Sequence, residues 1–207
     1  MNLERLYTAQ TVFLDRYPGG FAHPDMVEIG KKHRVDKIAA QTQSLLAKPV
    51  FKSQAQALEN IVKTVTRSSM VSMFEKPKFR DYVNGLSRDD RGSLSEGFRK
   101  MLHGNQEKGF NEVLDILIEG KLAKWSLMTI CNLYMHPEVD VFVKPTTTKR
   151  VISYLELEDV VYKPRPSWEF YVRYRDIIND LKGMVDPSLG PNNAAFTGFL
   201  MVTLEPG

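Results

Sequence analysis

Apolar side chains recur along this chain at the three- and four-residue spacing of amphipathic α-helices. In residues 53–67, with Ser53 as a candidate N-cap, this stripe consists of Ala57, Leu58, Ile61, Val62 and Val65. The same periodicity marks residues 2–16, 35–46, 109–118 and 168–185. Proline and glycine fall between these stretches, where they interrupt helices. The pattern predicts an all-α, compact multi-helix globular protein.

Residues 122–135 differ from the other helical stretches because they are apolar almost all round. The apolar side chains of this run are Trp125, Leu127, Met128, Ile130, Leu133 and Tyr134. A helix that is apolar on every side is expected to be buried, so we predict a central buried helix here. Cys131 lies within it and is predicted to be a buried, inert thiol. The β-branched clusters at 139–143 and 160–161 allow at most minor short strands.

Several helix boundaries can be predicted from capping patterns. Ser93 has Glu96 three residues later, which is the capping-box pattern, and predicts a helix start at Ser93. Asn193 is predicted to cap a last helix. Residues 70–74 are interpreted as either a buried helix or a sharp connection, and the Lys-Pro-Lys of 76–78 is expected to break the chain direction.

Length and composition indicate one folded domain. The chain has 207 residues, of which 43% are hydrophobic and 26% are charged, as in ordinary globular proteins. No composition shift marks a linker, so we predict a single domain over 1–207. A finer division into two halves, about 1–105 and 106–207, with a cleft between them, is also considered.

Net charge and cysteine content indicate which partners and which cellular compartment are compatible with the sequence. The net charge of +3 and the isoelectric point near 8.9 permit an anionic partner without requiring one. A single cysteine excludes an internal disulfide and is typical of a reducing compartment. The chain start has no signal-peptide pattern, and its longest apolar run is too short to span a bilayer. We therefore predict a cytoplasmic protein without a membrane partner.

Cationic and hydroxyl side chains gather around two proline-bearing segments, Lys144-Pro145 and the Lys-Pro-Arg-Pro of 163–166. Proline at the first helical position followed by threonines predicts a helix start whose N–H groups can bind phosphate. Trp168 is a candidate for stacking on a base. The predicted nucleic-acid or phosphate-binding residues are Lys121, Lys124, Lys144, Thr146, Thr147, Thr148, Lys149, Arg150, Lys163, Arg165 and Trp168. The alternatives are an ordinary capped helix with solvated lysines, and Trp168 as a core anchor.

A turn at Gly120 joins two predicted helices, Lys124 follows it, and a further helix begins near Pro145. Over residues 112–157 this order resembles the helix-hairpin-helix DNA glycosylase superfamily. The resemblance implies that Gly120 stands near the first hairpin glycine and Lys124 near the hairpin lysine. Leu122 occupies the position of the second glycine and Pro145 that of the catalytic aspartate, so glycosylase chemistry is not implied. The alternative is an ordinary αα-hairpin.

Catalytic signals are sparse. The four histidines are scattered, no recognisable catalytic motif occurs, and neither a metal nor a cofactor is predicted. Our leading prediction is therefore nucleic-acid (DNA) binding through residues 120–168. One alternative is a protein–protein interaction or regulatory module, suggested by 9 Met and 11 Phe. Another is an enzyme that holds a small anionic substrate at the helix start of 144–150. The sequence predicts no oligomeric state.

Overall fold

The computed structural model describes residues 1–204, and these form an all-α fold. Short 3-10 helices are η1 (Gly20–Ala22), η2 (Lys48–Lys52) and η3 (Pro187–Leu189). The α-helices are α1 (Leu3–Arg16), α2 (Pro24–His33), α3 (Val35–Leu45), α4 (Gln54–Arg67), α5 (Glu75–Gly85), α6 (Arg88–His103), α7 (Gln106–Glu119), α8 (Trp125–Met135), α9 (Pro145–Tyr154), α10 (Trp168–Gly183) and α11 (Asn193–Thr203). Over that range no strand occurs, so the β-branched clusters form none.

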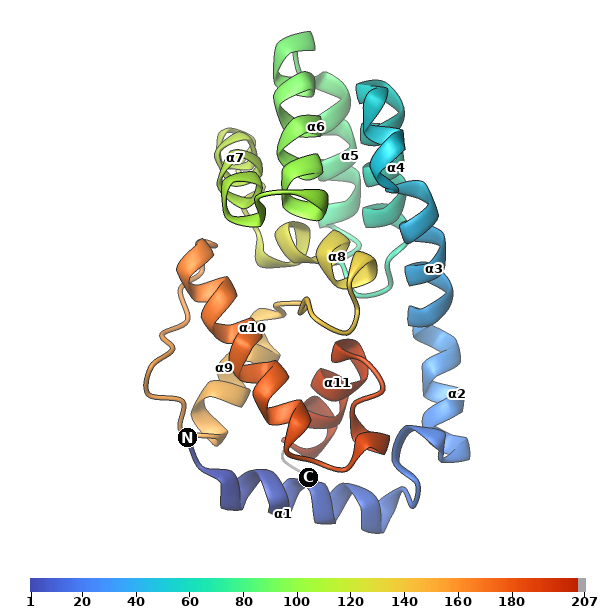
Figure 1. Cartoon of the computed structure of the whole chain (residues 1–207), viewed down its shortest axis with the longest axis vertical. Helices are drawn as coiled ribbons and strands as arrows, with labels where there is room; N and C mark the ends of the chain where they lie inside the picture. Colours follow the sequence, from blue (N-terminus) through green and yellow to red (C-terminus); the bar gives the residue numbers. More distant parts are fainter. Residues whose placement is uncertain (205–207) are drawn as a thin grey trace.

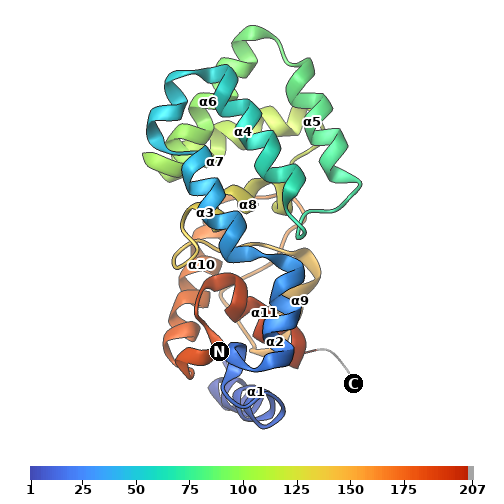
Figure 2. The ribbon, with the colours of Figure 1, turned by 90° about the vertical axis from the view of Figure 1, so that its right-hand side faces the viewer.

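The helices are arranged around α8, which crosses the middle of an elongated molecule (Figure 1). Helices α4 to α7 lie on one side of α8, and α1, α9, α10 and α11 lie on the other, while α2 and α3 run along one flank. Helix α1 packs against α11, so elements from the two ends of the chain share one end of the molecule. Turned by 90°, the structure places α5 and α9 on the same side (Figure 2).

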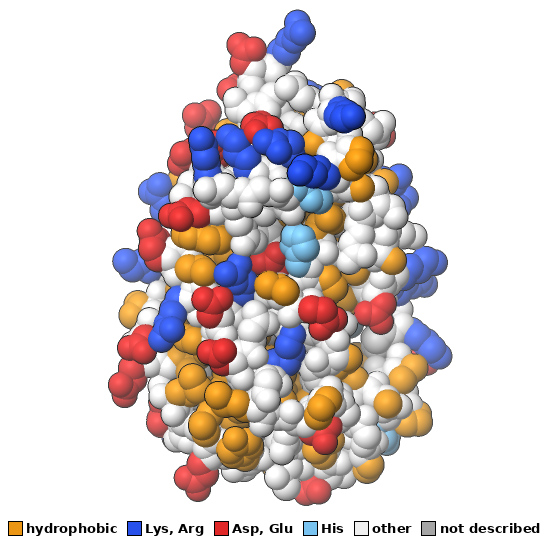
Figure 3. Space-filling view, in the orientation of Figure 1, with side chains coloured by type: hydrophobic (Ala, Val, Ile, Leu, Met, Phe, Trp, Pro, Cys, Tyr) orange, Lys and Arg blue, Asp and Glu red, His pale blue; other side chains and the backbone are white. Residues whose placement is uncertain are grey.

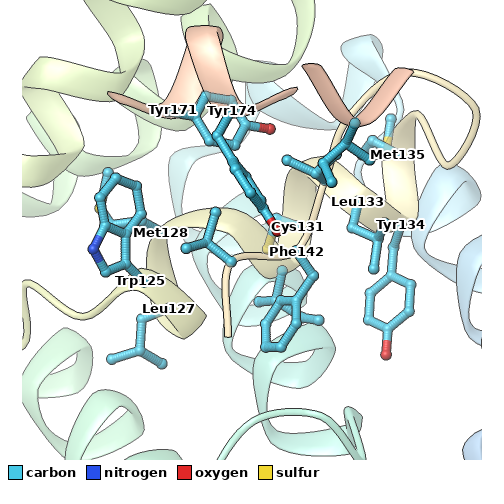
Figure 4. Close-up of a cluster of buried hydrophobic side chains, with 14 of the residues drawn as sticks. Trp125, Leu127, Met128, Cys131, Leu133, Tyr134, Met135, Phe142, Tyr171 and Tyr174 are labelled. Atoms are coloured by element: carbon cyan, nitrogen blue, oxygen red, sulfur yellow. The ribbon is translucent and has the colours of Figure 1, made fainter. Parts of the chain in front are cut away.

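The prediction of a central buried helix is confirmed. Every residue of α8 except Ser126 is buried. Figure 4 shows these side chains in one cluster, to which α10 contributes Tyr171 and Tyr174. The helix begins at Trp125 instead of residue 122, because Lys124 has an extended backbone (φ −114°, ψ 138°) and stands at the N-cap position. Burial raises the pKa of the Cys131 thiol to about 12, which fits the expected inert thiol.

Two predicted helix starts were wrong. Helix α6 begins at Arg88, and Ser87 caps it by accepting a hydrogen bond from the Asp90 N–H at 3.2 Å. Ser93 lies inside the helix, because the earlier serine is followed by acidic residues that suit the positive end of the helix dipole. Similarly, Asn192 caps α11, whereas Asn193 is fully buried.

Before α5, one of the two alternatives for residues 70–74 is confirmed, but the break expected at 76–78 is wrong. Residues 70–74 are a connection, and the Lys-Pro-Lys of 76–78 lies within α5 instead of breaking the chain direction. Pro77 falls in the first turn of that helix, where a missing N–H removes no intrahelical hydrogen bond. No helix within residues 1–204 is both long and apolar enough to cross a membrane.

Candidate functional site

The predicted threonine run divides between surface and core. Pro145 is the first residue of α9, as expected, and Lys144 stands at its N-cap position. Thr146 is exposed and Thr147 is half-buried, but the side chain of Thr148 is 1% exposed. Thr148 therefore supports the packing of α9 and cannot contact a ligand on the surface.

All seven predicted cations are solvent-exposed, and between residues 1 and 204 none of them forms an ion pair. Some lysines elsewhere are paired: Lys100 lies 2.6 Å from Glu112, and Lys31 lies 2.8 Å from Glu28. Other exposed lysines, such as Lys48, Lys52 and Lys108, resemble the seven predicted cations in forming no ion pair within residues 1–204. The seven predicted cations are Lys121, Lys124, Lys144, Lys149, Arg150, Lys163 and Arg165.

Contacts around Trp125 bring three of these cations to one edge of the molecule. The Trp125 indole Nε1 donates a hydrogen bond to the Lys163 carbonyl oxygen at 2.8 Å, which places Lys163 beside the start of α8 and thus near Lys124. The Trp125 ring also lies 6.5 Å from the Tyr162 ring. Lys149 Nζ sits 5.4 Å from the centroid of Tyr162, within cation–π range. Segments far apart in the sequence therefore present their cations together.

Helix α5 extends this region along the linker between α7 and α8. Ser126 Oγ donates to Glu75 Oε2 at 2.6 Å at one end of the linker. At the other end the Tyr82 ring lies so close to Gly120 that an added Cβ would meet it at 2.6 Å. Lys78 lies between Glu75 and Tyr82 in α5 and is solvent-exposed. Sequence reasoning missed Lys78 because its neighbour Pro77 was taken as a break.

We call this region the basic surface. It comprises the seven predicted cations and Lys78, which together are Lys78, Lys121, Lys124, Lys144, Lys149, Arg150, Lys163 and Arg165. Glu119, close to Lys121 in the sequence, and Glu169, next to Trp168, are exposed and form no ion pair within residues 1–204. In the segment 156–159, Glu156 pairs with Arg5 at 3.1 Å, and Asp159 pairs with Arg173 at 3.2 Å. Only Glu158 of that segment is exposed without a partner in the described part of the chain. Clustered cations with few counter-charges raise the local positive potential.

Trp168 does not point freely into solvent. Its ring packs 5.7 Å from Phe110 and 5.8 Å from Tyr171, and the Arg175 guanidinium lies 5.9 Å from its centroid. The side chain is half-buried. These contacts favour the alternative interpretation of Trp168 as a core anchor.

A second group of cations crosses the upper part of the face in Figure 3, with acidic side chains close to it. Lys48, Lys52 and Arg99 line a shallow hollow beside η2 together with Pro49 and Phe51. Arg99 is bound by both oxygens of Glu96, at 2.6 and 2.7 Å. Part of this charge is therefore neutralised within the protein, unlike that of the basic surface.

A buried polar cluster around Asp140 was not predicted from the sequence. Asp140 is 2% exposed and accepts hydrogen bonds from Gln106 Nε2 at 3.0 Å and from the Tyr171 hydroxyl at 2.8 Å. His136 Nδ1 lies 2.9 Å from Asp140 Oδ2, and Arg175 lies 3.7 Å from Oδ1. Burial alone would raise the Asp140 pKa, but the hydrogen bonds outweigh it and lower that pKa.

The Asp140 cluster connects helices. Asn193 Nδ2 donates to the Asp140 carbonyl oxygen at 3.1 Å and ties the start of α11 to the segment after α8. A histidine beside a buried carboxylate can act as a general base, but neither the hollow beside η2 nor the one on α1 borders His136. Among residues 1–204, no group of three or more His, Cys, Asp or Glu side chains is placed to hold a metal ion. The cluster is best explained as structural.

Nothing in the structure tests the resemblance to the helix-hairpin-helix superfamily, which stays a prediction. Leu122 is 5% exposed and helps to close the core, and Pro145 opens α9 where the superfamily has its aspartate. Comparisons of the chain with protein-family models, curated proteins and solved structures found no match.

Proposed function

We propose that the protein binds nucleic acid through the basic surface, with its lysine and arginine side chains contacting phosphate groups. The observation that carries this proposal is the gathering of exposed cations that lack ion-pair partners in the described chain. A regularly spaced polyanion gains affinity when such cations displace its condensed counterions. Phosphate contacts of this kind position the ligand and do not read its sequence.

The start of α9 supports the same proposal. Lys144, at the N-cap position, makes no side-chain hydrogen bond to the first turn. Helices α3, α5 and α8 also lack a side-chain cap, whereas Ser53, Ser167 and Asn192 each cap their helices. The first N–H groups of α9 are therefore not satisfied by a cap, and the exposed Thr146 lies beside them. A helix start with available N–H groups and a positive dipole is well suited to a phosphate.

Binding of a single-stranded oligonucleotide and of its duplex, followed by fluorescence anisotropy over a range of salt concentrations, tests the proposal. We expect affinity to fall steeply with salt, and the triple variant Lys124→Gln, Lys149→Gln, Lys163→Gln to bind more weakly. Each lost phosphate contact should reduce the salt slope for duplex by about 0.9. Salt-independent binding, or none, would contradict the proposal.

Lys48 and Lys52 of the second group, together with the exposed Lys108 of α7, supply the matched control. The triple variant Lys48→Gln, Lys52→Gln, Lys108→Gln removes the same charge from exposed positions over η2 and α7. We expect it to retain most of the affinity and most of the salt slope. If this variant loses binding while the first retains it, the interface lies on the other surface.

The alternative of an enzyme that acts on a small anion finds less support. The described hollows are lined by residues of α1 and by residues around η2, and neither includes the start of α9. Small-molecule sites are typically concave. An exposed helix start without a described hollow suits an extended polyanion better than a small substrate.

A further inference from the structure

The most exposed large apolar side chains lie on the segments that build the basic surface. Met73 and Phe74 are each 74% exposed and Val161 is 71% exposed, whereas no other large apolar side chain in residues 1–204 exceeds 55%. Phe74 directly precedes α5, whose Glu75 contacts the start of α8. Val161 precedes Tyr162, the ring beneath Lys149. Apolar exposure and unpaired positive charge therefore occur on the same segments of the chain.

The connection that carries Met73 and Phe74 is anchored at several points. At its base, Ser68 Oγ and the buried Tyr134 hydroxyl are hydrogen-bonded at 2.9 Å. In its middle, Val71 is 3% exposed and packs into the core. At its tip, Ser72 Oγ accepts a hydrogen bond from the Phe74 N–H at 3.2 Å. The exposed pair is thus presented by an ordered segment, which lowers the entropy lost when a ligand binds.

The high share of lysine among the cations of the basic surface indicates what kind of partner the exposed Phe74 ring contacts. Six of its eight cations are lysines. Lysine is depleted in protein–protein interfaces, whereas phosphate contacts use it routinely. Nucleic-acid bases offer π-faces to an aromatic side chain next to such cations, but only where the bases are not stacked within a duplex.

We infer that Phe74 stacks on an unpaired base, with Met73 beside it, and that the basic surface therefore prefers single-stranded nucleic acid to duplex. This inference rests on the proposed function, because the cations must hold the backbone while the ring meets a base. Trp168, the stacking residue expected from the sequence, is occupied by Phe110, Tyr171 and Arg175. Phe74 offers the exposed ring that this role requires.

The test compares Phe74→Ala, Phe74→Trp and the parent on a single strand and on the corresponding duplex. We expect Phe74→Ala to weaken single-strand binding about fivefold or more, the lower end of the usual effect of losing one stacked base. Duplex affinity and both salt slopes should stay unchanged because no charge is lost, and Phe74→Trp should retain affinity. Tyr7→Ala is the matched control, since Tyr7 is an aromatic residue 45% exposed on α1.

Other results of this experiment would contradict either the stacking of Phe74 or the binding of nucleic acid as a whole. If Phe74→Ala binds the single strand as the parent does, stacking is wrong and phosphate binding by the cations stands. If the parent binds no oligonucleotide, both proposals fail. If, in that case, the parent binds vesicles of phosphatidylcholine and phosphatidylserine and Phe74→Ala does not, the exposed tip contacts an anionic lipid surface instead. Melting curves exclude a folding defect, which is not expected at a side chain 74% exposed.

Discussion

The Trp125 indole donates a hydrogen bond to the main-chain carbonyl of Lys163, across 38 positions of sequence and at 2.8 Å. The bond holds the irregular segment before α10 against the start of α8. It also places Lys163 near Lys124, so one core side chain helps to build the edge where exposed cations meet. The hydrogen bond between Trp125 and Lys163 therefore contributes both to the stability of the fold and to the arrangement of the proposed interface.

Trp125→Phe should reveal this coupling, because phenylalanine fills most of the same space but donates no hydrogen bond. We expect a loss of about 0.5–1.5 kcal/mol in the free energy of unfolding, measured by denaturant titration, and weaker oligonucleotide binding. Trp168→Phe is a matched control, since between residues 1 and 204 the indole of Trp168 makes no hydrogen bond. Unchanged binding in Trp125→Phe would show that this bond does not order the interface.

Leu133→Ala tests the position of the core. Leu133 lies in α8 and is completely buried. Truncation of a packed core leucine leaves a cavity, so we expect the free energy of unfolding to fall by about 2–5 kcal/mol. A loss well below 1 kcal/mol in denaturant melts would mean that the surroundings of α8 are not the centre of the core.

Lys149→Ala with Arg150→Ala should separate binding from folding. Both side chains are exposed and lack ion pairs in the described chain, so their removal should leave the melting temperature nearly unchanged while oligonucleotide affinity falls. Val151→Asp on the same helix should instead unfold the region, because Val151 is 0% exposed and a buried carboxylate would have no partner. A large drop in melting temperature for the double alanine variant would show that these cations are structural.

Asp140→Asn should change how stability depends on pH. The pKa of Asp140 is lowered in the folded protein, so at acid pH this carboxyl group binds fewer protons in the folded state than in the unfolded chain. That stabilisation is present above the unfolded pKa of about 3.9 and is lost as pH falls through the lower, folded pKa. We expect the variant to be about 1–3 kcal/mol less stable at pH 7 and to show a shallower loss of stability in acid. Parallel curves for variant and parent between pH 6 and pH 2, followed by circular dichroism, would contradict this.

The sequence by itself determined the helical class and the most buried element. The apolar periodicity of α4, its cap Ser53 and the all-round apolarity of α8 depend on residues within a few positions of one another, and such local relations are readable without a fold. The same holds for Pro145 at the start of α9. Where two local signals competed, as at Ser87 and Ser93, the pattern alone did not decide which serine capped the helix.

Tertiary structure decided which residues share a surface. Lys78, Lys124 and Lys163 come from separate parts of the chain and are placed near one another only through the contacts of Glu75 and Trp125. Local sequence carries no information on such neighbours, because each is set by packing between helices. The exposure of Phe74 and the burial of Asp140 have the same origin: an apolar or acidic residue is placed by the room and the partners that the assembled helices leave for it.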